Sequence, residues 1–156
     1  MTGYQIGILF HLIGVILFFS GAAVAGVVAT AATGRRKPSD IAAILGLARP
    51  GAVMLAIGGV ILLLAGFYLA GKIHGYGQHW LEASIILFVV ALIAGAWGGR
   101  RSRRTREYAV ALAERGQGDE AVLRTMLADR LTWALHWASV ALAVLVLVLM
   151  VWKPGA

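Results

Sequence analysis

Four apolar runs, each long enough to cross a lipid bilayer, dominate this sequence. They cover about residues 4–32, 51–70, 80–97 and 131–152. The hydrocarbon core of a bilayer is roughly 30 Å thick and takes about 20 helical residues to span. Inside lipid the backbone must satisfy its own hydrogen bonds, so each run is predicted to be an α-helix. We therefore expect an all-α membrane four-helix bundle, with residues 1–156 as a single four-span domain.

The composition excludes most other classes of protein. Apolar residues make up 60% of the chain and charged residues 13%, too few to give a soluble domain its polar surface. Cysteine is absent, which excludes disulfides, Cys-ligated zinc, iron–sulfur clusters and a Cys nucleophile. The expected partner is the lipid bilayer. A homo-oligomer or a membrane-protein partner stays open.

The positive charges lie almost entirely in two of the segments between the runs, which predicts the orientation. The net charge is +7, and a soluble protein with this balance would be examined for nucleic-acid binding. Here the positive-inside rule accounts for the charge, so we expect no nucleic acid and both termini outside. The basic residues of the two segments are Arg35, Arg36, Lys37 and Arg49, then Arg100, Arg101, Arg103, Arg104, Arg106, Arg115, Arg124 and Arg130. On the other side are Lys72 and Lys153.

The longer basic segment, about residues 100–130, is predicted to be a helical cytoplasmic loop. Residues 103–115 have a helical pattern that Gly116 and Gly118 end. Asp119 can cap a second helix, which could continue into the fourth span. This helix carries an apolar stripe made of Val122, Leu123, Met126 and Leu127.

Small residues recur every seven positions in the first two spans, at Gly7, Gly14 and Gly21 and again at Gly51, Gly58 and Ala65. Such stripes let membrane helices approach closely. His11 shares the inward stripe of the first span and is expected in the outer half of the membrane. An ionisable residue inside the membrane is a candidate functional residue, although it also serves as a hydrogen-bond partner between helices.

Three further side chains are candidates for the same outer region. His79 and Glu82 are three residues apart at the start of the third span, and Met150 is near the end of the fourth. We predict His11 and Met150 as cofactor ligands, and His11, His79 and Glu82 as metal ligands. Imidazole with thioether suits Cu(I) or b-type haem iron. The alternative is that the loop histidines, including His74, simply face water.

His136 is expected in the opposite leaflet, roughly 10 Å from His11 along the membrane normal. A metal ion approaches each imidazole to about 2 Å, so the two histidines are not expected to share one. We interpret His136 as structural, since histidine often forms hydrogen bonds between membrane helices.

Motifs for known enzymatic chemistry are missing. The sequence has no glycine-rich phosphate loop, no HExxH motif and no pair of carboxylates within a span. No catalytic residue is predicted, and the sequence favours a protein that is not an enzyme.

Several motifs in order resemble a bacterial family of predicted integral membrane proteins, the domain of unknown function 2269. They are FHLIGVILFFSG in the first span, RPGAVMLAIGG at Arg49–Gly59, Trp80-Leu81, and VLMVWKPG near the end. The family is distantly similar to the copper-resistance protein CopD and to HemJ-type protoporphyrinogen oxidases. This resemblance implies a bacterial inner-membrane location and a haem or copper role for His11. It also implies that Lys153 could supply a cation near a haem propionate.

Two functions therefore stand side by side. The first is a small polytopic membrane protein that binds b-type haem or copper through His11. The second is a non-enzymatic structural or accessory subunit of a membrane complex, held together by small-residue packing.

Overall fold

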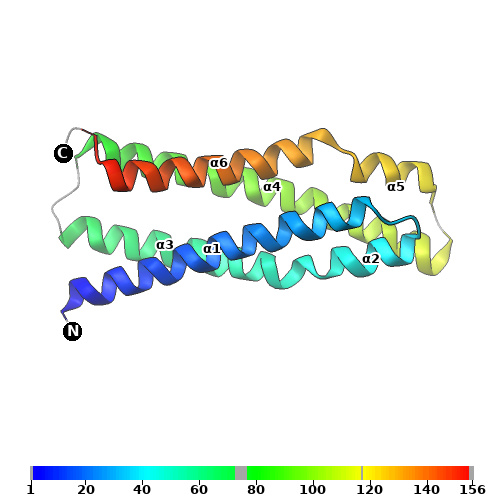
Figure 1. The fold of residues 1–156 in the computed structure, drawn as a ribbon, viewed down its shortest axis with the longest axis horizontal. Coiled ribbons are helices and arrows are strands. Elements are labelled where there is room, and N and C mark those ends of the chain that lie inside the picture. The colour runs from blue at the N-terminus through cyan, green and yellow to red at the C-terminus, as the bar shows by residue number, and fades with distance from the viewer. Residues whose placement is uncertain (1, 73–76, 117, 155–156) are drawn as a thin grey trace.

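The computed structural model describes residues 2–72, 77–116 and 118–154. Its helices are α1 (Gly3–Thr33), α2 (Pro38–Gly46), α3 (Ala48–Lys72), α4 (His79–Arg115), α5 (Glu120–Leu127) and α6 (Arg130–Trp152). Among these described residues, four helical segments are long and apolar enough to cross a membrane, which confirms the expected all-α four-span architecture. α1 begins and α6 ends at one end of the molecule, the terminal end (Figure 1). α2 and α5 lie at the other, the loop end (Figure 1).

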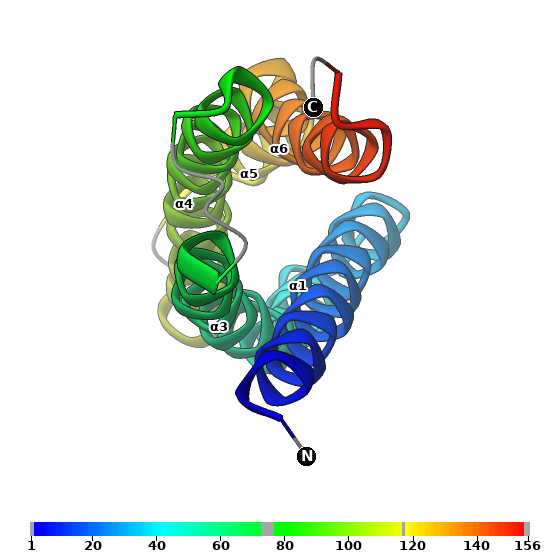
Figure 2. The same cartoon turned by 90° about the vertical axis from the view of Figure 1, so that its left-hand side faces the viewer.

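The spans associate as two pairs, α1 with α3 and α4 with α6. Figure 2, viewed from the terminal end, shows the α1–α3 pair on one side and the α4–α6 pair on the other. The predicted small-residue stripes form the first pairing. A Cβ added at Gly58 would lie 2.6 Å from the backbone nitrogen of Phe18, and one at Gly21 would lie 2.5 Å from the carbonyl oxygen of Gly51. Side chains larger than hydrogen would therefore push these helices apart.

At the loop end a cluster of apolar side chains joins the two pairs. Its buried members come from four helices: Val28 and Ala32, Ile41 and Leu45, Ala109, and Leu123. Arg124 of α5 adds polar contacts by donating hydrogen bonds to the carbonyl oxygens of Arg35 and Arg36. The bundle is thus closed at the loop end by contacts between the pairs.

Helix α2 differs from the sequence prediction, in which residues 35–49 form only a basic loop. Pro38 occupies the first turn, and Asp40 lies there as well. Proline suits a helix start and an acidic residue suits the positive end of the helix dipole. Ile41 and Leu45, four residues apart, are buried on one face.

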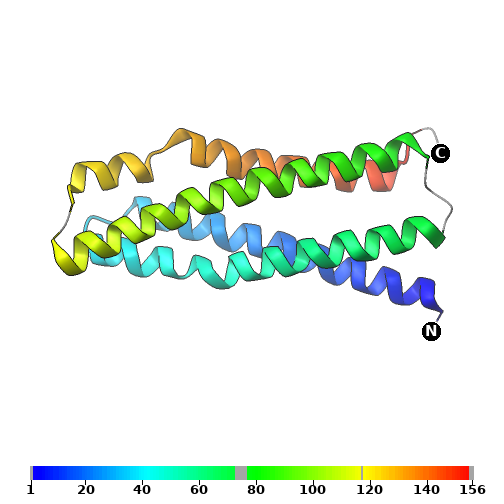
Figure 3. The same cartoon turned by 180° about the vertical axis from the view of Figure 1, so that it is seen from behind.

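Helix α4 is one continuous helix from the third span into the loop end, as Figure 3 shows from behind. Its 37 residues make it about 55 Å long, well beyond the roughly 30 Å hydrocarbon core. It ends where Gly116 takes a left-handed conformation with φ 61°. Asp119 then caps α5 through a 2.7 Å hydrogen bond from the amide of Ala121. The predicted end and cap are therefore confirmed.

The apolar stripe on α5 packs only in part. Leu123 is buried and Leu127 packs against the loop-end cluster, whereas Val122 is exposed. The expected continuation of α5 into the fourth span is not found. α5 ends at Leu127, and Asp129 caps a separate helix, α6, by accepting from the amides of Leu131 and Thr132.

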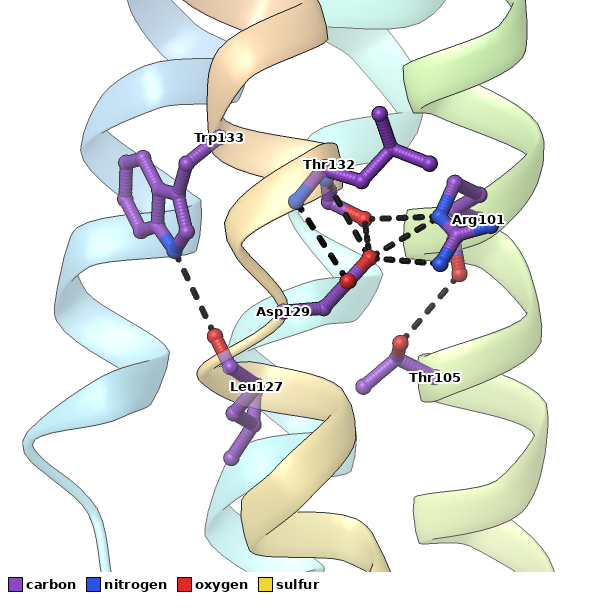
Figure 4. A network of polar contacts seen from close by, with 7 residues as sticks. Arg101, Thr105, Leu127, Asp129, Thr132 and Trp133 are labelled. Atoms are coloured by element: carbon purple, nitrogen blue, oxygen red, sulfur yellow. Dashed lines mark hydrogen bonds and ion pairs between the residues drawn. The ribbon is translucent and has the colours of Figure 1, made fainter.

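Asp129 also joins α6 to α4, as Figure 4 shows. Arg101 of α4 donates to one Asp129 carboxylate oxygen from Nε at 2.9 Å and from Nη2 at 2.7 Å. The hydroxyl of Thr132 donates to the same oxygen. One carboxylate therefore caps α6 and anchors it to α4.

Candidate functional site

A cavity of about 360 Å³ lies between the two helix pairs, toward the terminal end. All four spans contribute side chains to its wall. They are His11, Leu12, Val15, Phe18 and Phe19 of α1, Leu62, Leu63, Gly66 and Phe67 of α3, Leu81, Ser84, Ile85 and Phe88 of α4, and Ala143, Val146, Leu147, Met150 and Val151 of α6. Contacts between the pairs border it, among them the Phe18–Phe88 ring contact and the packing of Ala70 with Trp80. The volume of the cavity falls within the range of small-molecule pockets.

His11 is the ionisable residue of this wall. Its side chain is half-buried, and its Nδ1 atom is fully buried with no hydrogen bond of normal geometry, although the backbone of Leu62 is close enough to interact with the ring. The nitrogen lies on the α3 side, where a Cβ added at Gly66 would be 3.9 Å away. A buried imidazole nitrogen without a normal hydrogen bond has lost its hydration with little in return, which costs free energy. Because Nδ1 is covered by α3, the atom of this imidazole that a ligand in the cavity could meet is Nε2.

Met150 reaches the same cavity from α6, the helix of the other pair. It packs against two apolar clusters at once, one around Phe18 and Phe88 and the other around Trp80 and Leu81. A thioether is soft and polarisable, so it can serve as an apolar wall and as a metal ligand. The structure thus places both predicted cofactor ligands, His11 and Met150, on one cavity.

Ser84 is a lining residue that the sequence did not connect with the site. It is fully buried, and its hydroxyl donates a 2.7 Å hydrogen bond to the carbonyl oxygen of Trp80 one turn earlier. The hydroxyl oxygen keeps its acceptor capacity toward the cavity. Its position four residues after Trp80 on an otherwise apolar face was the available signal.

His79 and Glu82 do not join His11. They lie at the start of α4 with side chains 99% and 57% exposed, and their closest atoms, Nδ1 and Oε2, are 3.9 Å apart. Neither residue lines the cavity. In the described residues no group of three or more His, Cys, Asp or Glu side chains could hold a metal ion. The expected set of His11, His79 and Glu82 is therefore not assembled, because the first turn of α4 directs the last two outward. His74 lies outside the described residues.

His136 occupies a separate position. A Cβ added at Gly26 of α1 would lie 2.9 Å from its Nε2 atom, and its ring packs edge-on against Trp137 at 5.5 Å. Gly26 is fifteen residues beyond His11, about 22 Å along α1. The two histidines are therefore further apart than the 10 Å expected, since α1 is longer than a minimal span. They cannot ligate one metal ion.

The comparison with known families supports this architecture. Residues 8–154 match the model of a family described as "Predicted integral membrane protein (DUF2269)". The chain belongs to this family. The DUF2269 match covers three spans and most of the first, includes the cavity-lining residues His11 and Met150, and agrees with an integral membrane protein in a lipid bilayer. No curated protein and no solved structure matches the chain. The likeness to CopD and HemJ-type proteins stays a prediction from motifs.

Proposed function

We propose that this protein binds b-type haem in the cavity between its helix pairs, with His11 as the iron ligand and Met150 as the second ligand. One observation carries the proposal: an imidazole and a thioether line the same apolar cavity from different helix pairs. Histidine and methionine together are an established axial pair for haem iron.

The remainder of the lining fits a flat, mostly apolar macrocycle. Phe18, Leu62 and Phe88 offer aromatic and aliphatic contacts, and Ser84 has its donor already satisfied within α4. An apolar wall keeps water from the metal and so influences its redox potential. Bound haem would supply a one-electron redox centre, while this chain's residues bind it, orient it and exclude water.

Lys153 is placed to pair with a carboxylate at the terminal end. Its Nζ lies 5.7 Å from the centre of the Trp80 ring, and the residue is exposed. Trp80 is a buried member of the cluster against which Met150 packs. We propose Lys153 as the cation for a haem propionate. Imidazole and thioether suit both metals, and haem is favoured because the two donors line a large apolar cavity from different helix pairs, which leaves room for a macrocycle, while His79 and Glu82 face outward.

We further propose a bacterial inner-membrane location with the loop end in the cytoplasm. The support is the clustering of arginine at the loop end, on α4 and α5 and beside them. Both termini would then lie outside, and the haem cavity would lie in the outer half of the bilayer.

The test is the haem content of protein expressed with a haem precursor supplied and purified in detergent. We expect a Soret band in the wild type and at least about tenfold less haem in His11→Ala. Loss of a group that only hydrogen-bonds to a metal ligand already lowers metal affinity by about tenfold or more, and His11 would be the ligand itself. Met150→Leu conserves volume and should keep haem while changing its spectrum. His136→Ala is the matched control, because it removes an intramembrane imidazole that does not line the cavity.

A wild-type protein without a Soret band would contradict the proposal, and so would equal haem content in His11→Ala and wild type. Either result, together with a stable partner or homo-oligomer found by cross-linking in membranes, would favour the alternative of an accessory subunit.

A further inference from the structure

We propose a second binding site, at the loop end, that takes a phosphate-bearing anion on Arg104. The site is a pocket of about 270 Å³ where α4, α5 and α6 meet. Its lining residues are Arg101, Arg104 and Thr105 of α4, Thr125 and Met126 of α5, and Asp129 and Thr132 at the start of α6. The pocket lies on the opposite end of the bundle from the His11 cavity and is independent of it.

The two arginines of this pocket differ in what they already bind. Arg101 is engaged with Asp129 through two hydrogen bonds, and Thr132 donates to the same carboxylate. The Asp129 charge is therefore neutralised from within the protein. Within the described part of the chain, Arg104 makes no hydrogen bond or ion pair. The net charge of the pocket is thus positive, and a full guanidinium fork is available to an anion.

The other lining groups suit a phosphate. The hydroxyl of Thr125 donates to the carbonyl oxygen of Ala121 in its own helix at 3.0 Å and can rotate toward a ligand. Met126 lines the pocket beside it and offers an apolar contact. Arginine matches phosphate geometry through paired N–H donors, which favours this anion over a simple halide.

Position along α4 sets the depth of the pocket. The apolar run of α4 ends near Trp97, so Arg101 and Arg104 are about 6 and 10 Å further along the helix axis. The headgroup layer beyond the hydrocarbon core is roughly 5–8 Å thick on each side. The backbone of Arg101 is therefore within the headgroup layer, and that of Arg104 is about 2–5 Å beyond it, a distance that the long arginine side chain can span back to the lipid phosphates. A lipid headgroup and a free phosphate share the chemistry that the pocket would recognise, and basic pockets between spans bind anionic headgroups in other membrane proteins.

Two probes distinguish these sources: phosphatidylglycerol in phosphatidylcholine nanodiscs, and inorganic phosphate added to the detergent-purified protein at constant ionic strength. The full chain is used throughout. Retained lipid is counted by native mass spectrometry, and phosphate binding is followed by the shift in melting temperature. The test variant is Arg104→Gln. Its control is Arg103→Gln, which removes the adjacent charge from an exposed pair with Glu107 outside the pocket.

We expect wild type and Arg103→Gln to retain phosphatidylglycerol, and Arg104→Gln to bind it about fivefold more weakly, the effect of one basic side chain at an anionic surface. Stabilisation by inorganic phosphate alone, lost in Arg104→Gln, would support the site with a soluble ligand instead. Equal behaviour of Arg104→Gln and Arg103→Gln toward both probes would overturn the proposal. Arg104→Lys, which restores the charge, should recover part of the binding. If Arg104→Gln fails to fold, Arg104→Lys serves as the test variant. Binding by Arg104→Lys equal to that of wild type would show that the paired N–H donors of the guanidinium are not used, and would also overturn the proposal.

Discussion

Single residues at the loop end combine capping with tertiary contact, and Asp129 is the clearest case. Its carboxylate accepts hydrogen bonds from the amides of Leu131 and Thr132. It also accepts hydrogen bonds from the Thr132 hydroxyl and the Arg101 guanidinium. An N-cap contributes about 1 kcal/mol, and hydrogen bonds to a charged group contribute about 1.5–3 kcal/mol. Partial exposure of both side chains, 41% for Arg101 and 25% for Asp129, reduces the second figure.

A double-mutant cycle of Arg101→Gln and Asp129→Asn should give a coupling free energy of about 1 kcal/mol, measured by unfolding in mixed SDS micelles. The control cycle is Arg103→Gln with Glu107→Gln, whose charged side chains are 76% and 58% exposed. It should give a coupling near zero, because exposed pairs contribute little. Similar coupling in the two cycles would show that Asp129 has no special role.

The sequence predicted His11 as an inward-facing residue of α1 but could not show its surroundings. Met150 lines the same cavity as His11 from α6. Only the arrangement of the two helix pairs brings these residues together, and the sequence does not show that arrangement. His79 and Glu82 have the right depth and the right spacing, yet face away from the cavity. Depth along a helix follows from residue number, whereas the direction of a side chain in the first turn depends on how that helix rotates against its neighbours.

At the scale of helices, hydropathy and glycine spacing predicted most of the fold. The four spans follow from the length of the apolar runs. The α1–α3 pairing follows from glycines every seven residues. Two features were missed. α2 is short and largely apolar beside a basic segment, and the break between α5 and α6 has no Gly or Pro to indicate it. At this break the Asp129 carboxylate caps the start of α6 and so separates it from α5.

Close contact between α1 and α3 leads to a test of helix pairing. Gly58→Ala places a methyl group 2.6 Å from the backbone nitrogen of Phe18, so we expect destabilisation of about 1–3 kcal/mol from overpacking. The thermal midpoint, followed by circular dichroism in detergent, measures the effect.

Gly99→Ala is the matched control for this change. Nothing lies within 4 Å of a Cβ at Gly99, so alanine there should be neutral or stabilising, since glycine is the weaker helix former. A midpoint for Gly58→Ala equal to that of Gly99→Ala would contradict the close α1–α3 contact.

At the scale of the whole molecule, the two helix pairs are joined at the loop end and again around Phe18, Phe88 and Trp80, and the cavity lies between the pairs toward the terminal end. The apolar cluster around Ile41 and Leu123 holds the pairs together, with Arg124 tying α5 to the segment after α1. The loop end is also rich in arginine, which predicts that it faces the cytoplasm. The loop end therefore has both the apolar cluster that closes the bundle and the arginines that predict its orientation.

The absence of cysteine allows a clean test of that topology. Glu107→Cys labels the loop end and Lys72→Cys the terminal end, and both positions are exposed. A membrane-impermeant maleimide applied to intact bacterial cells should modify only Lys72→Cys, and should modify Glu107→Cys after permeabilisation. The opposite pattern would mean that the loop end lies outside.

The measurement that tests the central proposal most directly is chemical rescue of the His11 ligand. In His11→Gly the cavity keeps its apolar wall and loses its imidazole. Free imidazole added with haem should restore a Soret band in this variant towards that of the wild type. His136→Gly, whose lost imidazole lies away from the cavity, should bind haem without rescue. A His11→Gly protein that binds haem equally with and without imidazole, or a wild type that never binds it, would contradict the account.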